Sequence, residues 1–258
     1  LAVGMEEALL GDPDAAHAAF RALNRWVDDD WGLHYRDRIF SAPYLTLLDP
    51  DQALDEARWA VAGGARVVVM RAGPIMAPTG GRSPGDPLYD PMWKVLADAG
   101  VTVAYHSGEA GYGRYVVDWG ESAEFEAFRR TPLYGLLTSD RAISDTVAAL
   151  ICHGVFDRFP GLKVVFVEAG LCWVASMLHD ADMGANSFPN AMIPKLKHPP
   201  SWYWRNHCYA TFMTDPSGLQ LIDRIGPETA MWSSDYPHQE STFGYTGSSI
   251  QAVFDSVK

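Results

Sequence analysis

The sequence has 258 residues, a length that fits one large α/β domain or two small ones. Hydrophobic residues make up 48% of the chain and charged residues 20%, which excludes an intrinsically disordered protein. Its 32 acidic and 20 basic residues give a net charge of -12, which repels phosphate backbones and anionic lipids. We therefore expect a small-molecule substrate as the partner, with no nucleic acid and no membrane.

Cysteine spacing and the first residues indicate the compartment. Cys152, Cys172 and Cys208 are widely spaced and form no Cys-x-x-Cys pair, so they predict neither a disulfide framework nor a thiolate zinc site. No apolar run approaches the roughly 18 residues of a membrane span. Acidic residues stand near the start, where a signal peptide would be basic and then apolar. A cytoplasmic protein is expected.

Short β-branched runs alternate with longer helical patterns, and this alternation predicts βα units around a parallel sheet. The expected strands are residues 39–48, 65–70, 101–105, 162–167, 207–212 and 230–233. The expected helices are residues 5–29 with a break at 12–13, 51–62, 90–99, 139–159, 171–183, 216–225 and 250–257. A long Gly/Pro-rich loop is expected over 73–86 and an irregular stretch over 189–204. No composition shift divides the chain, so residues 1–258 are expected to form a single domain.

Four of the expected strands end in one ionisable residue, and each is followed by a loop that contains Gly or Pro. These residues are Arg71, His106, Glu168 and Asp235. In a barrel of parallel strands the carboxyl ends meet on one rim, so the four side chains should converge there. Each one alone can be a structural ion pair. Four together favour a functional site.

The residue types at these strand ends allow two kinds of chemistry. His106 and Asp235 offer nitrogen and oxygen ligands that suit zinc. A catalytic zinc normally has three protein ligands, so either Glu168 is the third or other ligands lie outside this sequence. Without a metal, Glu168 and Asp235 form a carboxylate pair of the kind used in acid/base catalysis. The residues alone leave both possibilities open.

Three segments, residues 89–108, 154–170 and 231–238, resemble the amidohydrolase-related family of the amidohydrolase superfamily. The group includes aminocarboxymuconate semialdehyde decarboxylase. The resemblance implies a distorted TIM (β/α)8 barrel that holds one divalent metal ion, usually zinc and sometimes manganese. It makes His106 the ligand after the fifth strand and Asp235 the ligand after the eighth, with Asp235 also a candidate general base.

The resemblance also numbers the strands. The six expected strands become the third to the eighth, and the family's His-x-His motif of the first strand has no counterpart here. The chain begins with Leu1 rather than Met. We therefore expect an N-terminally incomplete barrel whose remaining metal ligands lie outside this sequence, so that the ion is absent or weakly bound.

Hydrolysis of an amide, ester or lactone-like bond by a metal-activated water is the leading expectation, with Asp235 taking the proton and Arg71 or Glu168 orienting the substrate. The alternative is non-oxidative decarboxylation of an aromatic or unsaturated acid. Glu168 stands where several relatives carry His, and an ionised Glu would repel an anionic substrate unless burial raised its pKa. A third possibility is a non-catalytic barrel used for binding.

Two further residues are candidate substrate contacts. His238, three residues after Asp235, either contacts substrate at the mouth or faces solvent from a rigid turn. Tyr112, in the long loop after His106, is expected to line an aromatic or apolar pocket. Glu109 in the same loop either supports the His106 imidazole or is an exposed acid. A homodimer is a further expectation.

Overall fold

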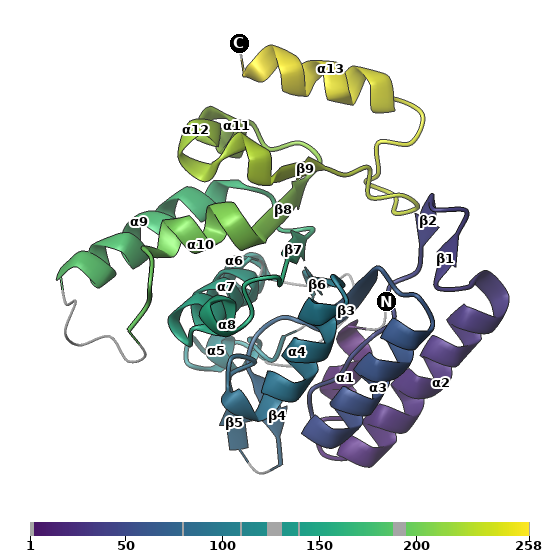
Figure 1. Ribbon diagram of the computed structural model, residues 1–258. Helices are drawn as coiled ribbons and strands as arrows, with labels where there is room; N and C mark the ends of the chain where they lie inside the picture. Colours follow the sequence, from purple (N-terminus) through teal and green to yellow (C-terminus); the bar gives the residue numbers. More distant parts are fainter. Residues whose placement is uncertain are drawn as a thin grey trace.

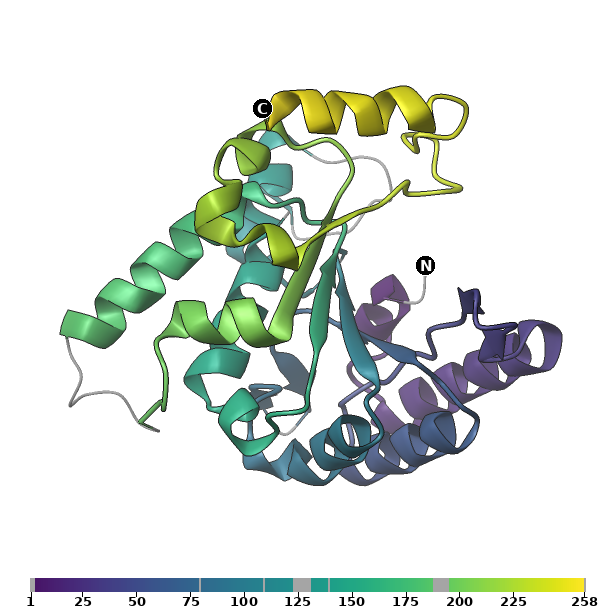
Figure 2. The same ribbon diagram turned by 45° about the horizontal axis from the view of Figure 1, so that its top comes forward.

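A parallel five-stranded sheet forms the centre of the fold (Figures 1 and 2). The computed structural model describes residues 3–78, 80–108, 110–122, 131–138, 140–187 and 195–257. The strands lie side by side in chain order: β3 (Val67–Arg71), β6 (Thr102–His106), β7 (Val164–Val167), β8 (Cys208–Phe212) and β9 (Ala230–Trp232). Helices connect successive strands, as parallel pairing requires. The expected α/β class is confirmed, and the sheet is consistent with a TIM-like barrel.

The helices follow the pattern expected of βα units. They are α1 (Val3–Ala8), α2 (Pro13–Trp31), α3 (Pro50–Ala62), α4 (Asp90–Asp98), α5 (Arg114–Val117), α6 (Pro132–Thr138), α7 (Arg141–Cys152), α8 (Val155–Arg158), α9 (Cys172–Ser187), α10 (Pro200–His207), α11 (Pro216–Gln220), α12 (Ile222–Ile225) and α13 (Thr246–Ser256). Two short 3₁₀ helices cover Pro87–Tyr89 and Pro227–Thr229. Among the described residues, no helix is both long and apolar enough to cross a membrane.

The two faces of the sheet differ in burial. One face packs against helices and is fully buried, and its residues are Val68, Met70, Val103, Tyr105, Val164, Phe166, Cys208 and Ala210. The alternate residues point to the opposite face. That face is half-buried at Val67, Val69, Val165, Val167 and Tyr209. Figure 2 shows the green helices α9 and α10 on one side of the strands and the purple N-terminal helix on the other.

The expected strand over 39–48 is not a strand of this sheet. Residues Ile39–Phe40 (β2) pair antiparallel with His34–Tyr35 (β1), and only Tyr44 makes a parallel bridge, to Val69 of β3. The other edge of Tyr44 is occupied by the side chain of Asn24. Its Oδ1 accepts from the Tyr44 N–H and its Nδ2 donates to the Tyr44 carbonyl, both at 2.8 Å. A side-chain amide thus replaces a neighbouring strand.

Other expected boundaries shift for local reasons. The helix expected over 139–159 is interrupted after Cys152, because Gly154 takes a left-handed conformation with φ of 69° between α7 and α8. The helix expected over 216–225 divides at Leu221 into α11 and α12. The expected loop 73–86 contains a hairpin of β4 (Ile75–Ala77) and β5 (Gly80–Arg82). The expected irregular stretch 189–204 overlaps α10, which Pro200 begins.

Candidate active site

Three of the four strand-end residues lie close together at the carboxyl end of the sheet. His106 is the last residue of β6, Glu168 follows β7 and Asp235 follows β9. The Nδ1 of His106 donates to the carbonyl of Ser107 at 2.5 Å, and Nε2 lies 3.4 Å from Oε2 of Glu168. The hydrogen bond from Nδ1 orients the His106 ring so that Nε2 faces the carboxylate of Glu168.

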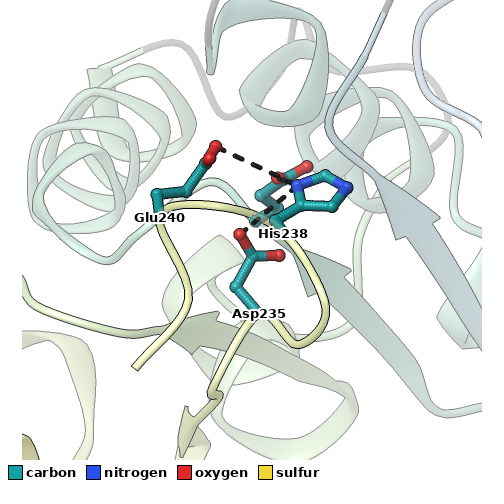
Figure 3. Close-up of side chains that lie close together, drawn as sticks. Asp235, His238 and Glu240 are labelled. Carbon is teal, nitrogen blue, oxygen red and sulfur yellow. Dashed lines mark ion pairs between the residues drawn. The ribbon is translucent and has the colours of Figure 1, made fainter. Parts of the chain in front are cut away.

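His238 links these residues into a cluster. Its Nδ1 lies 3.4 Å from Oδ2 of Asp235, 3.7 Å from Oε1 of Glu168 and 3.9 Å from Oε1 of Glu240. Figure 3 shows Asp235, His238 and Glu240 on the loop after β9 with their side chains gathered together. One ligand atom from each of these residues and one from Glu168 all lie within 4.8 Å of one another. Imidazole nitrogen and carboxylate oxygen are ligands that zinc and manganese accept.

The backbone turns sharply where the two carboxylates leave the sheet. Glu168 has a φ of 65° and Asp235 a φ of 56°, in the left-handed region that residues other than Gly rarely adopt. The N–H of Glu168 donates to Oγ1 of Thr211 in β8 at 3.0 Å, which fixes the first turn to the neighbouring strand. Strained backbone of this kind is typical of functional sites, where the surrounding structure holds it.

The cluster is electrostatically crowded. Burial raises the pKa of Glu168 above its usual range, and the nearby carboxylates of Asp235 and Glu240 raise it further, while His106 and His238 oppose the shift. A cavity of about 230 Å³ opens here, lined in part by Glu168, Thr211, Asp235 and Glu240. A divalent cation would offset the mutual repulsion of these carboxylates. The donor set therefore fits the ion that the motifs predict.

Arg71 lies next to this cluster in the sheet but has another partner. Arg71 and His106 are register neighbours in β3 and β6. The Nη2 of Arg71 is 2.8 Å from Oε2 of Glu7 in α1, and Nη1 donates to the carbonyl of Pro74 at 2.9 Å. Its buried Nε has no hydrogen-bond acceptor among the described residues. The N-terminal helix thus covers this guanidinium with a carboxylate of the chain itself.

Tyr112 is not part of the cluster either. Its ring is buried, and its hydroxyl donates to Oδ2 of Asp145 in α7 at 2.6 Å. It lines a separate cavity together with Tyr115. Glu109 lies outside the described residues. The structure therefore brings together His106, Glu168, Asp235 and His238, and it places Arg71 and Tyr112 in other contacts.

Glu240 is the cluster member that the sequence analysis missed. It lies five residues after Asp235 and two after His238, in the loop that follows β9. The sequence signal that could have identified Glu240 is the close spacing of Asp235, His238 and Glu240 within six residues of this loop. Strand-end reasoning overlooks such a residue, because its position depends on how the loop returns toward the sheet.

A comparison with protein families decides the family of this chain. A family model described as Amidohydrolase matches residues 1–251. The chain belongs to the amidohydrolase family. This confirms the family that the three segments resembled.

Solved structures of amidohydrolase-like fold agree with this family. An amidohydrolase from Mycobacterium avium subsp. paratuberculosis K-10 is 35% identical, with a TM-score of 0.85 over 98% of this chain. The present chain spans 62% of the length of that relative.

Two solved decarboxylases share the fold at lower identity. A 5-carboxyvanillate decarboxylase from Sphingomonas paucimobilis is 22% identical, with a TM-score of 0.65 over 95% of this chain and 69% of its own. A dihydroxybenzoic acid decarboxylase from Polaromonas sp. JS666, solved with manganese and the inhibitor 2-nitroresorcinol, is 16% identical, with a TM-score of 0.66 over 96% of this chain and 74% of its own. At these identities the likeness establishes the fold.

Proposed function

We propose that this protein is a metal-dependent, non-oxidative decarboxylase of an aromatic or unsaturated carboxylic acid. The observation that carries the proposal is the cluster of His106, Glu168, Asp235 and His238 at the carboxyl end of a parallel sheet of amidohydrolase type. Solved proteins of the same fold include decarboxylases of aromatic acids, one of them with manganese. These neighbours favour decarboxylation over the hydrolysis that the motifs led us to expect first.

The proposed metal ligands are His106 and Asp235, with Glu168, His238 and Glu240 within reach of the same centre. A bound divalent ion would supply Lewis-acid polarisation of the substrate's oxygen atoms. Zinc and manganese both suit this mixed nitrogen and oxygen set. The five strands, together with the segment bridged at Tyr44, are proposed to correspond to strands three to eight of one (β/α)8 barrel domain.

The chain's own side chains would supply the proton. Decarboxylation exchanges a C–C bond for a C–H bond, so a proton must reach the carbon that loses carbon dioxide. Glu168 and Asp235 are the proposed proton carriers, and His238, 3.4 Å from Asp235, is the proposed substrate contact at the mouth. Arg71 is the proposed anchor for the substrate's negative charge, in competition with Glu7.

The metal assignment is tested by the ion content of purified protein. His106→Ala and Asp235→Asn should each lower the bound manganese or zinc, measured by mass spectrometry after dialysis, by about tenfold or more. Asp223→Asn, an exposed carboxylate on α12, is the matched control and should retain the wild-type content. Unchanged metal in both cluster variants would contradict the assignment.

Carbon dioxide release separates decarboxylation from the second candidate, metal-dependent hydrolysis. The second candidate rests on the 35% identical relative, which is described as an amidohydrolase. A panel of hydroxylated aromatic acids should release carbon dioxide from the metal-loaded protein, and Asp235→Asn should slow the release by about 100-fold or more. Cleavage of amide, ester or lactone analogues without any release of carbon dioxide would instead favour hydrolysis.

A further inference from the structure

A second cavity, of about 350 Å³, is lined by residues that do not belong to the carboxylate and histidine cluster. Its walls come from the β4–β5 hairpin, the loop after β6 and helix α7, and include Arg82, Tyr112, Arg114, Tyr115 and Asp145. It shares no lining residue with the cavity at Glu168 and Asp235. Its volume is within the roughly 300–1,000 Å³ typical of small-molecule sites.

Arg114 brings a positive charge to this cavity. Its guanidinium carbon lies 4.8 Å from the centre of the Tyr115 ring and 5.7 Å from that of Tyr112. Its polar contacts are the hydroxyl of Tyr115 at 3.1 Å and the sulfur of Met76 at 3.4 Å. No carboxylate of the described residues forms an ion pair with it. Its guanidinium therefore keeps the capacity to bind a carboxylate through two parallel hydrogen bonds.

The two tyrosines form a rigid aromatic wall beside that cation. Their rings are perpendicular, with centroids 5.1 Å apart and an interplanar angle of 87°. Tyr112 is held by its 2.6 Å hydrogen bond to Asp145, and burial keeps its pKa far above the usual range, so the phenol remains neutral. Gly73 N–H donates to Oγ1 of Thr146 at 2.7 Å and joins the loop after β3 to α7. The hydrogen bond of Tyr112 and the edge contact between the two rings fix the geometry of this wall.

The charges around the cavity favour an anion. Arg82 and Arg114 both line it, whereas Asp145 is the one acidic residue among its described lining residues and already accepts the Tyr112 hydroxyl. Arg82 forms an ion pair with Asp86, with 3.4 Å between Nη1 and Oδ2. A flat ligand can therefore place its negative group on Arg114 and its ring against the tyrosines.

We propose that this cavity is a binding site for a planar organic carboxylate, with the carboxylate on Arg114 and the ring against Tyr112 and Tyr115, separate from the metal cluster. The site needs no bound metal and stands independently of the proposed decarboxylase activity.

Calorimetric titration of the full chain with benzoate tests the proposal. Benzoate should bind, whereas phenol, which lacks the carboxylate, and cyclohexanecarboxylate, which lacks the flat ring, should bind at least about tenfold more weakly. Arg114→Gln should weaken benzoate binding by about tenfold or more. Arg224→Gln, an exposed arginine on α12, is the matched control and should bind as wild type.

Further variants separate this site from the metal cluster. Asp235→Asn should keep the benzoate binding that depends on Arg114. Arg114→Lys and Tyr115→Leu provide independent variants, and both should weaken binding while circular dichroism stays that of the wild type. Absence of saturable benzoate binding, or binding that survives Arg114→Gln and disappears in Asp235→Asn, would overturn the proposal.

Discussion

His17 shows how one buried imidazole makes the fold sensitive to pH. Its Nε2 accepts the backbone N–H of Asp49, the N-cap of α3, at 3.1 Å, so the ring is neutral in the folded chain. Burial lowers the pKa of His17 below its ordinary value of 6.5. The unfolded chain then binds a proton that the folded chain does not. The contribution of His17 to stability is therefore complete above pH 6.5 and is lost as the pH falls toward the lowered pKa.

We therefore expect His17→Gln to flatten this part of the pH dependence. The glutamine amide keeps an acceptor for Asp49 but cannot be protonated. The loss of unfolding free energy between about pH 8 and about pH 5.5, measured by urea denaturation, should be smaller in this variant than in the wild type. His34→Gln, at an exposed histidine of β1, should leave the wild-type loss unchanged. Equal losses in all three proteins would contradict the prediction.

At the same scale, the sheet made three of the site residues predictable. His106, Glu168 and Asp235 could be predicted because parallel register brings strand ends to one edge. Arg71 follows the same rule, yet its side chain is bound by Glu7, 64 residues away in sequence. No local pattern contains that contact. Glu240 was missed for a different reason: a loop carries it, and its position depends on how that loop returns toward the sheet.

At the scale of elements, Asn24 joins α2 to the segment beside β3. Its side chain bonds both backbone groups of Tyr44 and also donates to Oε1 of Glu56 at 2.9 Å. Asn24 is 2% exposed, so water cannot replace these partners. Asn24→Ala should lower the unfolding free energy by about 3 kcal/mol, because it leaves buried polar groups without partners.

The matched control for this variant is Asn206→Ala. Asn206 is exposed on α10 and makes one side-chain bond, to the carbonyl of Trp202. Its loss should cost about 0.5 kcal/mol in the same urea titration. Similar costs for the two variants would show that Asn24 is not the lateral partner of Tyr44.

Element types were easier to predict than element edges. The break before α2 was expected at Asp12 and Pro13, and the helix α3 was expected from residue 51, one residue after its observed start. In the structure the carboxylates of Asp12 and Asp49 each cap the helix that follows. The predicted strand over 39–48 was wrong. The backbone N–H and carbonyl of Tyr44 are hydrogen-bonded by the side chain of Asn24 and not by a second strand. The start of α10 was hidden in a run of prolines and aromatic residues, where tertiary packing of Tyr203 and Trp204 outweighs local propensity.

At the scale of the whole molecule, the unequal burial of the two sheet faces is a testable property of the chain. Val164 is fully buried against helices, whereas its neighbour Val165 lies on the half-buried face. Threonine has nearly the shape of valine but adds a hydroxyl, which costs free energy where no partner is available. Val164→Thr should therefore lower the unfolding free energy by about 2 kcal/mol, and Val165→Thr by less than about 1 kcal/mol.

The same pair also tests how open the second face is in solution. An apolar face of this extent should bind the dye ANS in the folded protein, and Val165→Thr combined with Val167→Thr should reduce the fluorescence. Val164→Thr, on the covered face, should leave the dye signal of the folded protein unchanged. If instead Val165→Thr cost as much stability as Val164→Thr, the second face would be covered in solution, and the cluster at its carboxyl end would lie in an enclosed site.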